Sequence, residues 1–292
     1  MQNKVTIPAS FIVLILSLLI VTAANQGSVS ISDIPLFGFA VALTFIIQWV
    51  VFIPSFLNKT EHFFDLTGSL TFISVVLITL MLIPEIYVRD IVIALLVVIW
   101  ATRLGSFLFF RVRKDGGDGR FTVMKTKFWW FLMTWNIQGM WVFLSLAAGL
   151  AAMTSAEKVE ADIFLIVGLI VWVLGFSIEV ISDGQKSKFR SKTENKDKFI
   201  TSGIWSWSRH PNYFGEILLW CGITIIALPV LQGWQFITLI SPIFIIILLT
   251  QISGVRLLEL RGKKKWGENE EYQKYLRNTS VLIPLPQKNK KN

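Results

Sequence analysis

Residues 161–181, ADIFLIVGLIVWVLGFSIEVI, are the stretch that decides the fold. A helix needs about 20 mostly apolar residues to cross a bilayer, because in lipid the backbone must satisfy its own hydrogen bonds. Further stretches meet the same criterion at residues 8–25, 35–54, 66–84, 90–110, 128–152, 213–230 and 234–252. They predict an all-α, polytopic transmembrane helix bundle of about eight spans. Pro54 leaves open whether the second span is one helix or two shorter pieces.

The composition supports a membrane protein. The chain has 292 residues, of which 53% are hydrophobic and only 16% charged, whereas soluble domains carry about 25% charged residues. These values exclude a disordered chain and an ordinary cytosolic enzyme. The single cysteine, Cys221, excludes an internal disulfide and a cysteine-based metal site.

The basic residues predict the orientation of the spans. Of the 28 Lys and Arg, one precedes the first span, one follows the second, six follow the fourth, seven follow the sixth and ten lie in the tail. The opposite loops hold Arg89 and Lys158, and Arg103 lies inside the fourth span. By the positive-inside rule, both termini are expected in the cytoplasm. The net charge of +9 is thus a topology signal, and it indicates anionic membrane lipid rather than nucleic acid as the partner.

The N-terminal segment has two interpretations. Lys4, the apolar stretch 11–21 and the small residues after it resemble a signal peptide, but the apolar run is long for one, so a retained signal anchor is the alternative. We expect residues 1–34 to form an N-terminal helix and loop, residues 35–285 the membrane domain, and residues 286–292 a disordered basic tail.

Ionisable residues inside or bordering the spans are the candidate functional residues, since such groups are costly in lipid and usually face a cavity or a partner. Glu179 and Asp183 are spaced four residues apart, and so are Asn212 and Glu216. This spacing places the members of each pair on one helical face. His62 and Asp65, three residues apart, are also expected to share a face. The clustering predicts a polar cavity open to the cytoplasm. The residues concerned are His62, Asp65, Arg103, Glu179, Asp183, Arg190, Arg209, His210, Asn212 and Glu216.

Structural roles are open for the same residues. Asp65 and His62 could cap the helix N-terminus, and Arg103 could extend to the membrane surface. Glu179 and Asp183 could simply be solvated at the end of the sixth span. The segment Gly116-Gly117-Asp118-Gly119 is interpreted as a loop, because no phosphate-binding pattern surrounds it.

Residues 202–216, SGIWSWSRHPNYFGE, resemble the C-terminal signature of the membrane steroid 5α-reductase family, and most closely its bacterial branch. Their Arg-His-Pro-x-Tyr-x-Gly core also occurs in membrane methyltransferases such as isoprenylcysteine carboxyl methyltransferases. The core by itself is therefore compatible with either NADPH or S-adenosylmethionine.

Other stretches favour the reductase resemblance. Residues 179–183, EVISD, followed by Arg190 are similar to its cofactor motif, and Asn212 and Glu216 match its Asn-x-x-Gly-Glu motif. The resemblance implies a seven-helix reductase-like core, here with an added N-terminal helix, and NADPH as cofactor. The implied cofactor-binding residues are Arg103, Glu179, Asp183, Arg190, Arg209, His210, Asn212, Glu216 and Arg256.

The implied catalytic residues depart from the family pattern. Asp65 stands close to where the reductases carry a glutamate, and Trp100 stands where they carry a tyrosine. Tryptophan can donate one hydrogen bond but cannot act as a phenolic acid. His62 is the third candidate catalytic residue.

The expected activity is NADPH-dependent reduction of a conjugated carbon–carbon double bond in a lipophilic, steroid-like or isoprenoid enone. The expected setting is lipid metabolism in a bacterial inner membrane, without a metal. The alternatives are an S-adenosylmethionine-dependent membrane methyltransferase and a non-enzymatic membrane protein. A transporter would predict paired repeats and helices broken near mid-membrane, which the sequence does not suggest.

Overall fold

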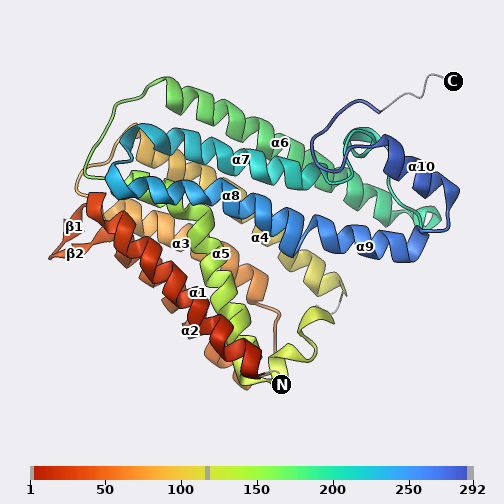
Figure 1. Ribbon diagram of the computed structural model, residues 1–292, viewed down its shortest axis with the longest axis horizontal. Coiled ribbons are helices and arrows are strands. Elements are labelled where there is room, and N and C mark those ends of the chain that lie inside the picture. The colour runs from red at the N-terminus through yellow and green to blue at the C-terminus, as the bar shows by residue number, and fades with distance from the viewer. Residues whose placement is uncertain (1–2, 116–118, 288–292) are drawn as a thin grey trace. The chain divides into compact units, whose positions relative to one another are not determined.

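The computed structural model describes residues 3–115 and 119–287, and most of them are helical (Figure 1). A short antiparallel pair, β1 (Ser30–Ile31) and β2 (Ile34–Pro35), lies between the first two helices. Ten α-helices are assigned within the described residues: α1 (Asn3–Ala24), α2 (Leu36–Leu57), α3 (Phe64–Leu82), α4 (Val88–Asp115), α5 (Phe128–Thr154), α6 (Ile163–Ser191), α7 (Pro211–Ala227), α8 (Ile240–Ile247), α9 (Val255–Trp266) and α10 (Glu270–Asn278).

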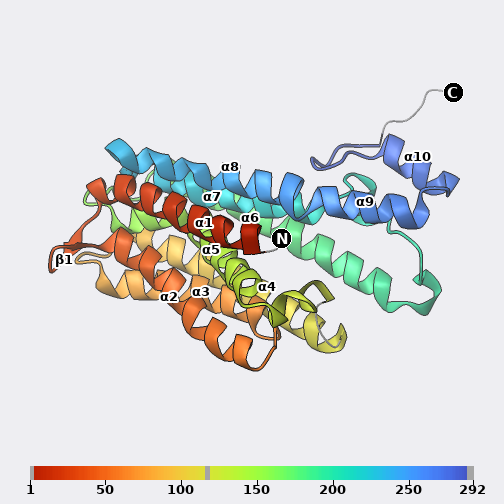
Figure 2. The same cartoon turned by 60° about the horizontal axis from the view of Figure 1, so that its bottom comes forward.

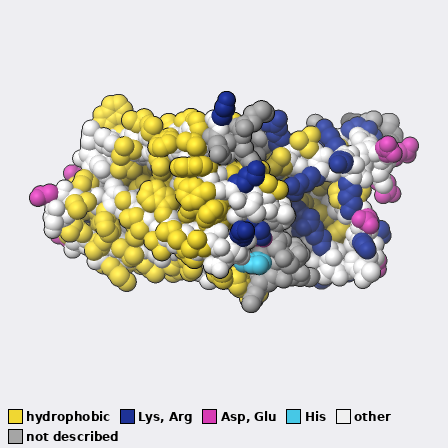
Figure 3. Space-filling model, turned by 90° about the horizontal axis from the view of Figure 1, so that it is seen from below, with side chains coloured by type: hydrophobic (Ala, Val, Ile, Leu, Met, Phe, Trp, Pro, Cys, Tyr) yellow, Lys and Arg dark blue, Asp and Glu magenta, His cyan; other side chains and the backbone are white. Residues whose placement is uncertain are grey.

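The predicted number of spans is confirmed. In the part of the chain that the structure describes, eight helical stretches are long and apolar enough to cross a membrane. The last of them runs from Gly233 to Trp266 through α8 and α9. Many apolar side chains on these stretches are exposed, for example Ile163, Ile166 and Ile170 on α6. Figure 3 shows one face of the protein, on which apolar side chains, drawn in yellow, gather over a wide area. The protein is therefore an integral, multi-pass membrane protein with a helical fold.

Several helix ends differ from the predicted spans, and those of α2 and α6 bear on the predictions. The helix α2 continues through Pro54 to Leu57 as one helix. The helix α6 continues ten residues beyond the predicted end at 181, so that Asp183 and Arg190 are helical. Hydropathy marks where a helix leaves the apolar region and not where its hydrogen bonding stops, which explains the difference.

The expectation that His62 and Asp65 share a helical face is wrong. The helix α3 begins at Phe64, so that Asp65 is in its first turn and His62 precedes it. The Thr60 hydroxyl lies 3.0 Å from His62 Nδ1 and accepts a weak hydrogen bond from the His62 amide at 3.4 Å. Such local bonding by a threonine side chain competes with helix formation.

The chain divides into two compact units. Unit 1 comprises Met1–Leu165 and Ile226–Ser241, and unit 2 comprises Ile166–Ile225 and Pro242–Asn292. The boundaries expected at 34/35 and 285/286 stay predictions. Of the expected basic tail, residues 288–292 lie outside the described residues, as do residues 116–118 of the expected glycine-rich loop.

Unit 1 is organised around α5, whose C-terminal half, from Val142 to Thr154, is buried throughout. The helices α1 to α4 pack around it, and Figure 2 shows β1 beside the ends of α1 and α2. Buried polar side chains link the helices: Gln48 Nε2 donates to Thr71 Oγ1 at 2.8 Å, and Trp49 Nε1 donates to Asn136 Oδ1 at 2.8 Å. Interhelical hydrogen bonds of this kind help to join helices where the surrounding lipid provides little hydrophobic driving force.

The two basic residues of the predicted outer loops are both paired within unit 1. Arg89 forms an ion pair with Asp162 at 2.9 Å and donates to the Ile226 carbonyl. Lys158 contacts both oxygens of Asp90 at 3.0 and 3.1 Å, and Asp90 is only 1% exposed. These cations therefore tie loops and helix ends of unit 1 together.

Unit 2 contains a break in the last span. The helix α8 passes into a π-helical segment at Leu248–Ile252, and α9 begins after Gly254. A Cβ on Gly254 would lie 2.1 Å from the Leu249 carbonyl oxygen and 2.9 Å from Tyr213 Cε2. A glycine is thus required at this position because the backbone of the π-helical segment leaves no room for a Cβ. Single π-turns inside α-helices occur frequently at functional sites.

Candidate functional site

The helices α6 and α7 are in backbone contact, and they carry the polar residues of the two motifs. A Cβ added to Gly215 would lie 2.6 Å from the Gly175 carbonyl oxygen and 2.7 Å from the Glu179 amide nitrogen. Small residues allow helix backbones to approach in this way. The approach brings the beginning of α7 against the segment of α6 that contains Glu179 and Asp183.

The contact assembles a group of carboxylates and an amide. Asn212 Nδ2 donates a hydrogen bond to Asp183 Oδ1 at 3.2 Å. Asp183 is 9% exposed and Glu179, one turn earlier, is 3% exposed. Glu216 is half-buried and follows Gly215, the residue that abuts Glu179. We call Glu179, Asp183, Asn212 and Glu216 the α6–α7 cluster; its members come from both predicted motifs.

Two of the implied cofactor-binding arginines, Arg190 and Arg256, lie on helices of unit 2. Arg190 is on α6, two turns beyond Asp183, and its side chain is exposed. Arg256 is exposed in the first turn of α9. Their roles toward a ligand stay predictions.

Arg209 and His210 both contact Glu259 of α9. One carboxylate oxygen of Glu259 lies 3.1 Å from Arg209 Nε and 3.0 Å from His210 Nε2. Arg209 also donates from Nη1 to the Leu276 carbonyl at 2.7 Å. Burial lowers the pKa of His210 below its ordinary value, an effect that Glu259 opposes and that the charges of Lys186 and Arg209 reinforce. These two residues are thus anchored by neighbouring parts of unit 2.

The C-terminal segment 275–285 covers the Arg-His-Pro region. Tyr275 donates from its hydroxyl to the Trp205 carbonyl, and Arg209 donates its backbone amide to the Ser280 carbonyl at 2.9 Å. The Ser208 hydroxyl donates to the Leu282 carbonyl at 2.7 Å. Desolvation raises the pKa of Tyr275, so the phenol stays protonated and remains a donor. The segment is therefore a structural part of the region that contains the Arg-His-Pro core.

The remaining candidate site residues belong to unit 1. They are the three predicted catalytic residues and Arg103. Trp100 is 1% exposed and packs edge-to-face against Phe72 with ring centroids 5.1 Å apart. Arg103 is half-buried on α4, with its guanidinium carbon 5.5 Å from the Phe107 ring centre. Asp65 is half-buried and His62 is exposed. The convergence of these residues with the α6–α7 cluster on one hollow stays a prediction.

Glu259 is the residue that sequence reasoning missed. It is the only carboxylate between Arg256 and Trp266, in a stretch with five cations. An isolated acid in a basic helix next to the membrane could have indicated a paired residue. Trp205, in the segment before α7, is 3% exposed and donates from Nε1 to the Ser182 carbonyl at 3.0 Å.

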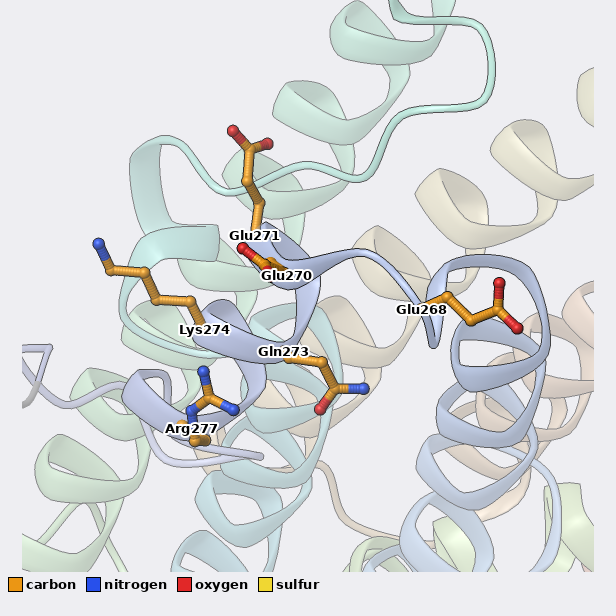
Figure 4. Close-up of a pocket in the computed structure, with 6 residues that line it drawn as sticks. All are labelled: Glu268, Glu270, Glu271, Gln273, Lys274 and Arg277. Atoms are coloured by element: carbon orange, nitrogen blue, oxygen red, sulfur yellow. The ribbon is translucent and has the colours of Figure 1, made fainter.

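Two surface hollows lie in unit 2. One, of about 480 Å³, runs along α10, and Figure 4 shows the acidic, basic and amide side chains around it. The other, of about 390 Å³, is bordered by Arg209 and the C-terminal segment. The first is an open, mixed-charge surface without any predicted site residue in its lining. Within the described residues, no group of three or more His, Cys, Asp or Glu is arranged to hold a metal ion.

Comparisons with known proteins assign the family of this helical membrane protein. The family described as protein of unknown function DUF1295, which is steroid 5α-reductase-like, matches residues 49–279. The chain belongs to this family. The match includes every predicted site residue.

Curated relatives are more distant. A 3-oxo-5-alpha-steroid 4-dehydrogenase 1 of Bos taurus is 30% identical over 28% of this chain and 31% of its own length. The protein of the same name from Rattus norvegicus is 24% identical over 40% of each chain. A probable O-methyltransferase ustE of Ustilaginoidea virens is 24% identical over 37% of this chain and 45% of its own. The chain thus spans less than half the length of each of these relatives. No solved structure matches.

Proposed function

We propose that this protein is an NADPH-dependent membrane reductase of a conjugated carbon–carbon double bond in a lipophilic, steroid-like or isoprenoid enone. Family membership and the names of the mammalian relatives support this proposal. The observation that carries it is the contact of Asn212 with Asp183, because it joins the two motifs that resemble the reductase cofactor site. We place the protein in a bacterial inner membrane.

The residues present fit such a cofactor. The buried carboxylates of Glu179 and Asp183 accept hydrogen bonds, which suits the hydroxyl and carboxamide donors of a dinucleotide. Arg190, with Arg103 and Arg256, would hold the phosphates, because guanidinium groups bind phosphate oxygens bidentately. NADPH, when bound, supplies the hydride for the β-carbon of the enone.

Side chains of the protein would stabilise the negative charge that develops on the substrate. As negative charge develops on the carbonyl oxygen, Asp65 in its protonated form would donate to that oxygen, and the α-carbon would then take a proton from water. The Trp100 ring packs against the rings of Phe72 and Trp141, which suits a fixed wall of the substrate site. His62 would assist by orienting the carbonyl. The substrate would enter from the bilayer, past the apolar surfaces of the helices.

A methyltransferase is the second candidate function. The Arg-His-Pro-x-Tyr-x-Gly core and the match to the probable O-methyltransferase favour it. The cofactor would then be S-adenosylmethionine, which lacks phosphates, so its single carboxylate is the one anionic group that an arginine could bind.

Thermal unfolding of the purified protein in detergent distinguishes the reductase from the methyltransferase, because a ligand that binds only the folded state raises the melting temperature. We expect NADPH, and not S-adenosylmethionine, to stabilise the protein. Arg190→Gln should weaken NADPH binding about 10- to 100-fold, the loss of one charge-assisted phosphate contact. Lys188→Gln, a neighbouring exposed cation on α6, is the matched control. Stabilisation by S-adenosylmethionine alone would overturn the reductase assignment.

A further inference from the structure

We propose that Glu259 is a positioning residue of the candidate site. Its carboxylate holds His210 in one tautomer and thereby fixes the first turn of α7, which carries Asn212. The part of this inference that concerns cofactor affinity rests on the proposed function. The part that concerns the tautomer does not.

His210 is at the start of α7 and is held by its backbone and by its ring. Its carbonyl accepts from the Phe214 amide at 3.2 Å, the first hydrogen bond of the helix, and its own amide donates to Ser208 Oγ at 3.1 Å. Its ring lies parallel to the Tyr213 ring, with 6° between the planes. Because His210 is only 5% exposed, its ring has little room to move independently of the start of α7.

Glu259 determines which ring nitrogen carries the proton. A carboxylate only accepts hydrogen bonds, so the nitrogen facing it, Nε2 at 3.0 Å, must be the protonated one. In the neutral ring, Nδ1 then has the free lone pair. Among the described residues, Nδ1 has no hydrogen-bond partner. No second hydrogen bond to the ring, among the described residues, sets the tautomer, so we assign this role to Glu259.

The first turn of α7 is held on two sides. On one side, Asn212 donates to Asp183 of α6, and Gly215 abuts Glu179. On the other side, His210 contacts Glu259, and Tyr213 lies against Gly254, where α9 begins. If the Glu259 contact is lost, the turn is fixed mainly from the α6 side. The Asn212 amide would then sample more positions relative to the cluster.

Two variants separate the carboxylate's roles. Glu259→Gln keeps an acceptor for Nε2 but removes the charge, and Glu259→Leu removes both while keeping a similar volume. Glu268→Leu, at an exposed acid on the α10 hollow, is the control for loss of a negative charge. The chain has two histidines, so ¹⁵N NMR of histidine-labelled protein gives two imidazoles, and the His210→Gln variant assigns them.

We expect His210 in the wild type to show a protonated Nε2 and an unprotonated Nδ1. Glu259→Leu should yield a mixture of tautomers and about tenfold weaker NADPH binding. Glu259→Gln should retain most of the tautomer preference and most of the NADPH affinity. Glu268→Leu should change neither the tautomer nor the affinity.

The proposal is overturned if Glu259→Leu keeps the wild-type tautomer, or if the tautomer changes while the NADPH affinity does not. A wild-type protein that fails to bind NADPH would instead refute the proposed function. The tautomer measurement uses no cofactor, so it still decides whether Glu259 positions His210.

Discussion

The variant Gly215→Ala tests the close approach of α6 and α7. The new methyl group would lie 2.6 Å from the Gly175 carbonyl oxygen, where ordinary van der Waals contact begins at 3.4 Å. The helices would have to separate by about 0.8 Å, the difference between these distances. Because the atoms that are met belong to the backbone, no side-chain rotation can relieve the overlap. Overpacking of this kind costs up to about 3 kcal/mol.

The net effect is smaller, because alanine is favoured over glycine in a helix by about 1 kcal/mol. We therefore expect a loss of about 2 kcal/mol, which corresponds to a fall in melting temperature of roughly 4–8 °C for a chain of this size. Gly184→Ala is the control: a Cβ at Gly184 of α6 meets no atom within 4 Å, so this variant should gain stability.

The assay is thermal unfolding of the purified variants in one detergent, followed by near-ultraviolet circular dichroism. NADPH binding should weaken in Gly215→Ala, since the separation pulls Asn212 away from Asp183. If Gly215→Ala melts at or above the wild-type temperature, the helices do not pack backbone to backbone as described.

Two further perturbations concern other charged groups. Lys158→Met leaves the buried Asp90 carboxylate without its cation and should lower the free energy of unfolding by about 3–5 kcal/mol. The double variant Lys158→Met with Asp90→Asn should recover much of this loss. Equal stability of the single and double variants in urea titrations would contradict the pairing. Burial lowers the pKa of His210 below 6.5, so the unfolded chain binds a proton that the folded one does not, and stability should fall as the pH drops below 6.5. His210→Gln should flatten this part of the curve of melting temperature against pH, and an unchanged slope would show that His210 is not the group responsible.

The spans could be predicted from the sequence because the physical constraint on them is local. A bilayer requires about 20 consecutive apolar residues, and this requirement is met or missed within each stretch. The end of α6 could not be predicted in the same way. Beyond residue 181 its sequence is polar, and hydropathy does not distinguish a helix in water from a loop.

The α6–α7 cluster was predictable because each pair within it is spaced by one helical turn. Asp183 and Asn212 were linked only by the resemblance, which relates two motifs 29 residues apart. In the structure a hydrogen bond joins the two side chains within unit 2. The contact of Glu259 with His210 spans 49 residues. It depends on how α9 packs beside α7, which neither periodicity nor motif spacing specifies.

His62 shows the limit of spacing arguments. Three residues separate it from Asp65, but the helix starts between them, so the rule for shared helical faces does not apply. The start is set by the local hydrogen bonds of Thr60 and by the turn that precedes α3, details that a residue count omits.

Transfer of deuterium is the most direct measurement of the cofactor assignment. NADPH carrying deuterium at its transferable position would be supplied to the protein in proteoliposomes with a lipophilic enone, and the product would be examined by mass spectrometry and NMR. We predict one deuterium on the β-carbon of the saturated product, and loss of this product in Asp65→Leu, which removes the hydrogen-bond donor. A product without deuterium, or a methylated product formed only with S-adenosylmethionine, would contradict the assignment.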